Sequence, residues 1–98
     1  MTPKAFGARI DANHPEIRDA LRKAGYIVCD TFRAGFGVPD MFVLSKSKHW
    51  IGFEIKVPGE KLTKKEAELF DQVCPGPLYT VTTAEQALVL LDEYDRKP

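Results

Sequence analysis

The chain has 98 residues, 44% of them hydrophobic and 29% charged, and its formal net charge is zero. This length suits one domain over residues 1–98, and the composition excludes an intrinsically disordered protein. Zero net charge excludes a uniformly basic nucleic-acid coat, although positive charge gathers locally, with six Lys between residues 46 and 65. No apolar run has the length of a signal peptide or a membrane span, so we expect a soluble cytoplasmic protein without membrane contact.

The first predicted element is a helix from Pro15 to about Ala24. Asn13 is its expected N-cap, and Glu16 three residues later would complete a capping box. Gly25 ends this helix. The preceding residues 1–10 show no periodicity and are expected to form a loose arm.

Three segments rich in β-branched and aromatic residues follow, and each predicts a strand. They cover Tyr26–Phe32, Val38–Leu44 and Trp50–Val57. The first two are separated by the glycine-containing loop Arg33–Gly37, and the polar segment Ser45–His49 should connect the last two as a hairpin.

The remaining chain predicts a helix, a strand and a second helix. Thr63 and Glu66 form a capping box for a helix ending near Val73, whose buried face would contain Ala67, Leu69, Phe70 and Val73. Leu78–Thr82 should be a short strand. Thr83 and Gln86 form a further capping box for a helix through about Tyr94. The predicted order is therefore αβββαβα, an α/β fold.

The cysteines and histidines do not predict a metal site of their own. Cys29 and Cys74 belong to no CxxC or Cys/His cluster, which argues against zinc. Cys29 lies in an apolar run and is expected to be buried. His14 and His49 have no partner at ligand spacing, so neither is a convincing ligand or general base.

We expect two acidic side chains to meet at one end of the predicted hairpin. Opposed residues of an antiparallel pair have numbers with a constant sum, here about 94, which places Asp40 opposite Glu54. Like charges opposed in this way are destabilising, and a divalent cation would offset the repulsion. The alternative is that Asp40, which follows a proline, is an ordinary turn residue.

Lys56 lies two residues after Glu54 and should share its face of the strand. Its ammonium group could stabilise a pentavalent phosphate transition state. Oxygen ligands favour Mg²⁺ or Mn²⁺ over Zn²⁺. A Glu-x-Lys pattern by itself is weak, because on an exposed strand it usually marks a solvated face.

Three motifs together resemble the VRR-NUC branch of the PD-(D/E)XK nuclease superfamily, especially its small stand-alone phage and bacterial members. They are Gly37-Val-Pro-Asp40, Phe53-Glu-Ile-Lys-Val-Pro-Gly59 and Leu62-Thr-x-x-Glu66. The resemblance covers about residues 13–82. It implies a restriction-endonuclease-like αβββαβ core with a mixed four-stranded sheet flanked by helices, here with an extra C-terminal helix. It also implies the cytoplasm of a bacterial or phage-infected cell.

The resemblance further implies an Mg²⁺-dependent or Mn²⁺-dependent endonuclease that hydrolyses DNA phosphodiesters. Asp40, Glu54 and the carbonyl of Ile55 match the metal ligands, and Lys56 matches the catalytic lysine. Glu16 matches a helix-borne acid that often completes the metal site, but it fits the helix cap equally well.

Four residues that flank the expected site are candidates for DNA binding, namely Arg33, Phe36, Lys61 and Lys64. Solvated surface charge would also explain the three cations, and core packing would also explain Phe36.

We expect a homodimer, because so small a domain cannot enclose a duplex. Branched DNA such as a Holliday junction is the favoured substrate by family analogy. Two other functions stay open. One is a catalytically weak DNA-binding module, and the other is a small interaction protein whose contact surface is the apolar segment Leu88–Leu91.

Overall fold

The computed structural model describes residues 12–34, 37–74 and 76–97, so the predicted arm at residues 1–10 and Phe36 lie outside the described residues. Its order, αβββαβα, confirms the prediction. The elements are α1 Asn13–Lys23, β1 Ile27–Asp30, β2 Met41–Leu44, β3 Trp50–Ile55, α2 Lys64–Val73, β4 Leu78–Val81 and α3 Ala84–Arg96.

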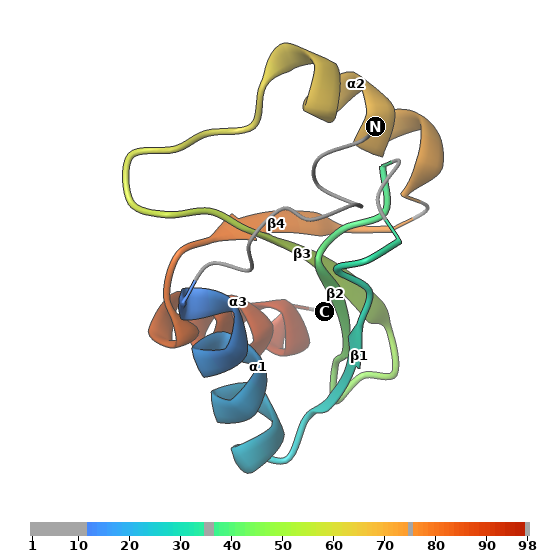
Figure 1. Ribbon diagram of the computed structural model, residues 1–98. Helices are drawn as coiled ribbons and strands as arrows, with labels where there is room; N and C mark the ends of the chain where they lie inside the picture. Colours follow the sequence, from blue (N-terminus) through green and yellow to red (C-terminus); the bar gives the residue numbers. More distant parts are fainter. Residues whose placement is uncertain (1–11, 35–36, 75, 98) are drawn as a thin grey trace.

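The strands form one mixed sheet in the order β1-β2-β3-β4 (Figure 1). The β1–β2 and β2–β3 pairs are antiparallel, and β3 pairs with β4 in parallel because α2 carries the chain back to the starting edge. The predicted α/β fold with a mixed four-stranded sheet is therefore confirmed.

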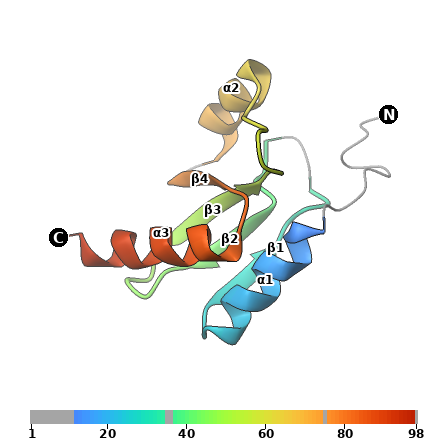
Figure 2. The same ribbon diagram turned by 90° about the vertical axis from the view of Figure 1, so that its left-hand side faces the viewer.

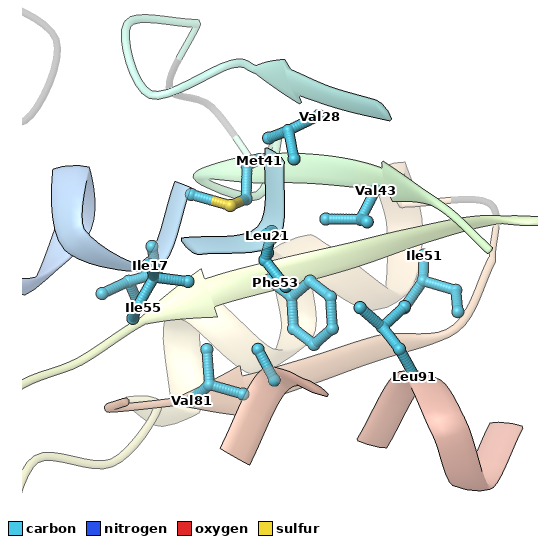
Figure 3. Close-up of a cluster of buried hydrophobic side chains, with 11 residues drawn as sticks. Ile17, Leu21, Val28, Met41, Val43, Ile51, Phe53, Ile55, Val81 and Leu91 are labelled. Carbon is cyan, nitrogen blue, oxygen red and sulfur yellow. The ribbon is translucent and has the colours of Figure 1, made fainter. Parts of the chain in front are cut away.

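The hydrophobic core lies between one face of the sheet and the helices α1 and α3 (Figure 3). Alternate residues of each strand point to this face, so Phe53 and Ile55 from β3 meet Ile17 from α1 and Leu91 from α3. The buried core is Ile17, Leu21, Val28, Met41, Val43, Ile51, Phe53, Ile55, Val81, Ala87 and Leu91.

Helix α2 lies on the opposite side of the sheet from α1 and α3 (Figure 2). Among the described side chains of α2 only Phe70 is buried, whereas Ala67 is exposed and Val73 is 43% exposed. The predicted buried face is therefore mostly wrong. Helical periodicity identifies the apolar side of a helix, but it does not say how much of that side the fold covers.

The predicted cap of α1 is wrong. The helix begins with Asn13 itself, and its N-cap, Ala12, makes no side-chain capping bond. The Asn13 amide instead donates to the backbone carbonyls of Lys56 and Thr82, each at 3.0 Å. A tertiary contact with the ends of β3 and β4 has displaced the local capping box, so Glu16 does not complete one.

The other two caps were predicted more accurately. Thr63 and Glu66 form the complete capping box at α2. At α3 the Thr83 hydroxyl accepts from the N–H of Gln86, as predicted. The Gln86 side chain, however, accepts from the N–H of Thr82 at 2.7 Å, one residue before the expected donor.

The prediction that Cys29 is buried is also wrong, because its side chain is exposed. It lies on β1, an edge strand, and Cys29 pairs with Phe42 on the face away from α1. Within the described ranges, no helix has both the length and the apolar character needed to cross a membrane.

Candidate active site

The end of the β2–β3 hairpin brings Asp40 and Glu54 together. Met41 pairs with Phe53 and Val43 with Ile51, so the numbers of opposed residues sum to 94 as predicted. Asp40 directly precedes β2 and therefore faces Glu54. Both acids are nearly fully buried, with 3% of Asp40 and 2% of Glu54 exposed.

Backbone hydrogen bonds hold the two carboxylates in place. The N–H of Ile55 donates to Asp40 Oδ2 at 2.8 Å, and the N–H of Asp40 donates to Glu54 Oε1 at 3.2 Å. Each acid is thus fixed by the backbone of the segment that carries the other. These two hydrogen bonds fix the orientation of both carboxylates within the folded protein.

The segment that carries Asp40 is held from two sides. Thr31 donates from its hydroxyl to the carbonyl of Pro39 at 2.6 Å and from its N–H to the carbonyl of Asp40 at 3.0 Å. Pro39 is buried against Gly52, where an added Cβ would lie only 2.9 Å from Pro39 Cγ. Thr31 and Gly52 therefore position Asp40, and sequence reasoning missed both because they act across strands.

Lys56 shares a face with Glu54, as predicted, and its side chain is only 13% exposed. Its Nζ lies 4.0 Å from Glu54 Oε2 and 3.1 Å from each carboxylate oxygen of Glu66. The N–H of Lys56 donates to the carbonyl of Val81 at 2.9 Å, which extends the β3–β4 pairing beyond Ile55. The amino group is therefore held beside the carboxylate pair.

The contact of Glu66 with Lys56 was not predicted. The spacing of Thr63 and Glu66 indicates a helix cap, and that part is confirmed. The Thr-x-x-Glu spacing describes only the start of the helix. It does not predict how close Glu66 lies to Lys56, because the two residues are 10 positions apart in sequence and a loop connects β3 to α2. Only the burial of Lys56, which needs a partner for its charge, could have suggested a second acid.

The site fits Mg²⁺ or Mn²⁺. These cations prefer oxygen ligands, and Mg²⁺ is often held by one or two carboxylates with water completing its coordination. Asp40 and Glu54 present two buried carboxylates at one point, and the carbonyl of Ile55 follows directly after Glu54. These three residues could hold one cation.

Glu16 is not gathered into this cluster. It is exposed on the first turn of α1. Across residues 12–34, 37–74 and 76–97, no three His, Cys, Asp or Glu side chains are grouped so that they could hold a metal ion. The role of Glu16 as a further ligand stays a prediction.

The predicted DNA-contacting residues lie on segments that enter or leave the site. Arg33 is exposed in the turn between Thr31 and Asp40. Lys61 and Lys64 are exposed on the segment that links β3 to the first turn of α2. All three cations are accessible, as phosphate contacts require.

A separate polar cluster joins α1 to β1 and was missed by the sequence reasoning. His14 is 2% exposed, and its Nε2 lies 3.1 Å from Asp30 Oδ2. Burial would raise the pKa of Asp30, but the hydrogen bonds from the N–H of Phe32 and from His14 outweigh it and hold that pKa below its usual value. The cluster tethers the helix to an edge strand beside the Asp40 segment, because Asp30 pairs with Met41.

Comparisons of the chain with protein-family models, with curated proteins and with solved structures gave no match in any of the three. A functional assignment therefore depends on the residues and the geometry themselves. The structural feature most informative about function is the buried pair of Asp40 and Glu54, with the amino group of Lys56 beside it.

Proposed function

We propose that the protein is a metal-dependent endonuclease that hydrolyses DNA phosphodiester bonds at a site formed by Asp40, Glu54 and Lys56. The observation that carries the proposal is the burial of two opposed carboxylates, 3% and 2% exposed, at the end of the hairpin. Burying like charges together opposes folding. A catalytic cation gives a reason to keep the pair.

Asp40, Glu54 and the carbonyl of Ile55 would hold Mg²⁺ or Mn²⁺, which when bound lowers the pKa of water and supplies a nucleophile near neutral pH. The chain's own contribution is orientation, since both carboxylates are fixed by backbone N–H donors. Lys56 would place its positive charge beside the phosphate as negative charge develops there. Its fixed position means that little reorganisation is needed during the reaction.

The distribution of charge supports DNA as the substrate. Lys61 and Lys64 lie near the start of α2, on the side of the sheet where Lys56 meets Glu66. Helix α3, on the other side, exposes acids including Glu85 and Asp92. Helix α2 also exposes Glu68 and Asp71, so a polyanion would contact the α2 side at the lysines near the start of the helix, even though the net charge is zero.

The motif resemblance supports two refinements. A homodimer would present two active sites to two DNA strands, and branched DNA such as a four-way junction is the favoured substrate. Such an enzyme would act in the cytoplasm of a bacterial or phage-infected cell.

The two alternatives are less well supported. A catalytically weak DNA-binding module that retains the fold has little use for the buried acids Asp40 and Glu54. An interaction protein that used the Leu88–Leu91 segment would need that surface to be accessible. Leu91 is 0% exposed, and Leu88 and Leu90 pack against the core, so the fold already uses three of the four side chains and leaves Val89, 56% exposed, as the main apolar contact of this segment.

The proposal is tested by incubating labelled single-stranded, duplex, flap and four-way-junction DNA with Mg²⁺, Mn²⁺ or EDTA. Wild type is compared with Asp40→Asn, Lys56→Ala and the control Glu85→Gln, which alters an exposed acid on α3. We expect metal-dependent cleavage by wild type and the control, and none by the two site variants. No cleavage of any DNA, with binding unchanged in Asp40→Asn, would favour the binding module.

A further inference from the structure

Lys56 lies between two acids, and the nearer one is not the predicted metal ligand. Both oxygens of Glu66 lie 3.1 Å from Lys56 Nζ, whereas the closest oxygen of Glu54 lies at 4.0 Å. A lysine ammonium on its four-carbon stem has considerable rotamer freedom. Contact with both oxygens of Glu66 removes much of that freedom.

Glu66 is itself fixed by the helix that carries it. Its N–H donates to the Thr63 hydroxyl at 3.0 Å, and its Oε1 accepts from the N–H of Thr63 at 2.9 Å. The same Oε1 also accepts from Lys56. One carboxylate thus connects the first turn of α2 to the lysine on β3.

We propose that Glu66 is a positioning residue that sets the place of Lys56 Nζ in the active site. The inference rests on the proposed nuclease function and names the residue that controls its lysine. Glu66 holds Nζ beside Glu54 without letting the two form a close ion pair. When Glu66 is removed, Lys56 loses its nearest partner and either closes onto Glu54 or moves into solvent.

A capping role alone would not produce this arrangement. Capping requires an acceptor for the N–H of Thr63, which a single oxygen supplies, but here both oxygens contact Lys56. The two roles can be separated by mutation. Thr63→Ala removes the capping hydroxyl and leaves the carboxylate of Glu66 beside Lys56, whereas Glu66→Ala removes both contacts.

The first readout needs neither DNA nor metal. Folded wild type, Glu66→Ala, Glu66→Gln, Thr63→Ala and the control Glu68→Ala, an exposed acid on the same helix, are acetylated briefly with an N-hydroxysuccinimide ester. Peptide mass spectrometry then follows Lys56, with the exposed Lys64 as the internal reference. We expect a changed Lys56 to Lys64 ratio in Glu66→Ala, a smaller change in Glu66→Gln, and the wild-type ratio in Thr63→Ala and Glu68→Ala.

The second readout is cleavage of DNA at saturating metal. Misplacement of a reacting group by about 1 Å can cost about 10²-fold, so kcat should fall by up to that factor in Glu66→Ala with little change in KM. Glu66→Gln should recover part of the loss, because its amide oxygen can still accept from Lys56. Thr63→Ala should lower the melting temperature while kcat stays at the wild-type value.

An unchanged acetylation ratio in both Glu66 variants would overturn the proposal, and so would equal losses of kcat in Glu66→Ala and Thr63→Ala. Should Glu66→Ala fail to fold, Glu66→Gln decides by the same two readouts. The acetylation result stands even when wild type cleaves no DNA. A changed ratio in an inactive protein would support the Glu66–Lys56 link and reject the nuclease function separately.

Discussion

The N–H of Asp40 donates a hydrogen bond to Glu54 Oε1 at 3.2 Å, so the backbone of one acid holds the carboxylate of the other. In return, the N–H that follows Glu54 in the chain, that of Ile55, donates to Asp40 Oδ2 at 2.8 Å. Two carboxylates fixed in this way cannot separate without breaking the end of the hairpin. Their repulsion is therefore a cost built into the fold, and its relief can be measured.

Replacing Asp40 by Asn should separate metal binding from folding. Asn keeps an oxygen that can accept from the N–H of Ile55, so the free energy of unfolding in EDTA should be equal to or above that of wild type. Mn²⁺ at 100 times its dissociation constant should stabilise wild type by about 2.7 kcal/mol and Asp40→Asn by far less. Urea denaturation with Mn²⁺ and with EDTA measures both quantities.

Asp92→Asn is the matched control, because Asp92 is exposed on α3. It should show the full stabilisation by Mn²⁺. Equal stabilisation of wild type and Asp40→Asn would contradict a metal site at Asp40.

Gly52→Ala should damage the site without altering any charged residue. The added methyl group would lie 2.9 Å from Pro39 Cγ and 3.2 Å from Leu78 Cδ1, so Pro39 must shift and carry Asp40 with it. Overpacking of this kind costs about 1–3 kcal/mol, and cleavage should fall by about 10-fold or more. Urea denaturation and cleavage rates measure the two effects.

Gly25→Ala provides the comparison, since its Cβ would meet nothing within 4 Å but its φ of +97° strains the backbone. That variant should lose stability and keep full cleavage at saturating DNA. If Gly52→Ala cleaves as fast as Gly25→Ala, Pro39 does not position Asp40.

Most of the fold was predictable from local pattern. Alternation and turn residues placed every strand, and the hairpin sum of 94 gave the register that opposes Asp40 and Glu54. The ends of the strands were less predictable. For example, β2 starts at Met41 and not at Val38, because Pro39 has no N–H to donate to the ladder.

What the sequence did not predict depends on contacts between distant segments. Asn13 follows the pattern of a helix cap, yet its amide binds carbonyls 43 and 69 residues away in sequence. Glu66 follows a capping pattern correctly, but its second role depends on where α2 lies relative to β3. Exposure of Cys29 depends on the place of β1 at the edge of the sheet. None of these facts has a local signature.

Asn13→Ala should loosen α1 from the ends of β3 and β4. The variant loses hydrogen bonds to the carbonyls of Lys56 and Thr82, each at 3.0 Å. Loss of both should lower the free energy of unfolding by about 1–3 kcal/mol. Asn13→Asp should lower it further, because a carboxylate would face two carbonyl oxygens with no hydrogen to donate. Urea denaturation that ranks the alanine variant below the aspartate variant would contradict this account.

Asp30 should contribute to the pH dependence of stability. Its pKa is lowered in the folded protein: burial acts against the shift, but the N–H of Phe32 and His14 outweigh it. The unfolded chain therefore binds the proton more readily, so this stabilisation is present above the ordinary pKa of Asp, about 3.9, and is lost as pH falls through the lower folded value. Asp30→Asn should be less stable than wild type by about 1 kcal/mol at neutral pH.

The difference between Asp30→Asn and wild type should shrink as the pH falls below about 4. Urea denaturation from pH 3 to pH 7 measures it, with Asp71→Asn, an exposed acid on α2, as the control. A difference that stays constant with pH would show that the loss comes from packing and not from the charge of Asp30.

Neutralising Lys61, Lys64 or Arg33 should weaken DNA binding through the phosphate backbone. These exposed residues lie on the two segments that border the site. Each phosphate contact contributes about 0.9 to the slope of log K against log salt for duplex DNA. Replacement of any one by Gln should therefore make the slope shallower by about that amount. The loss of affinity should be similar for DNAs of different sequence, because phosphate contacts do not read bases.

Fluorescence anisotropy at several salt concentrations measures the slope, with Asp40→Asn as the parent protein because we expect this variant not to cleave the DNA. Arg96→Gln is the control, because Arg96 is 71% exposed at the end of α3 and lies 3.2 Å from Asp92. Its slope should equal that of the parent protein, since α3 lies on the opposite side of the sheet from α2. A slope that changes as much in Arg96→Gln as in Lys64→Gln would mean that DNA does not approach from the side of α2, and the assignment of that surface would fail.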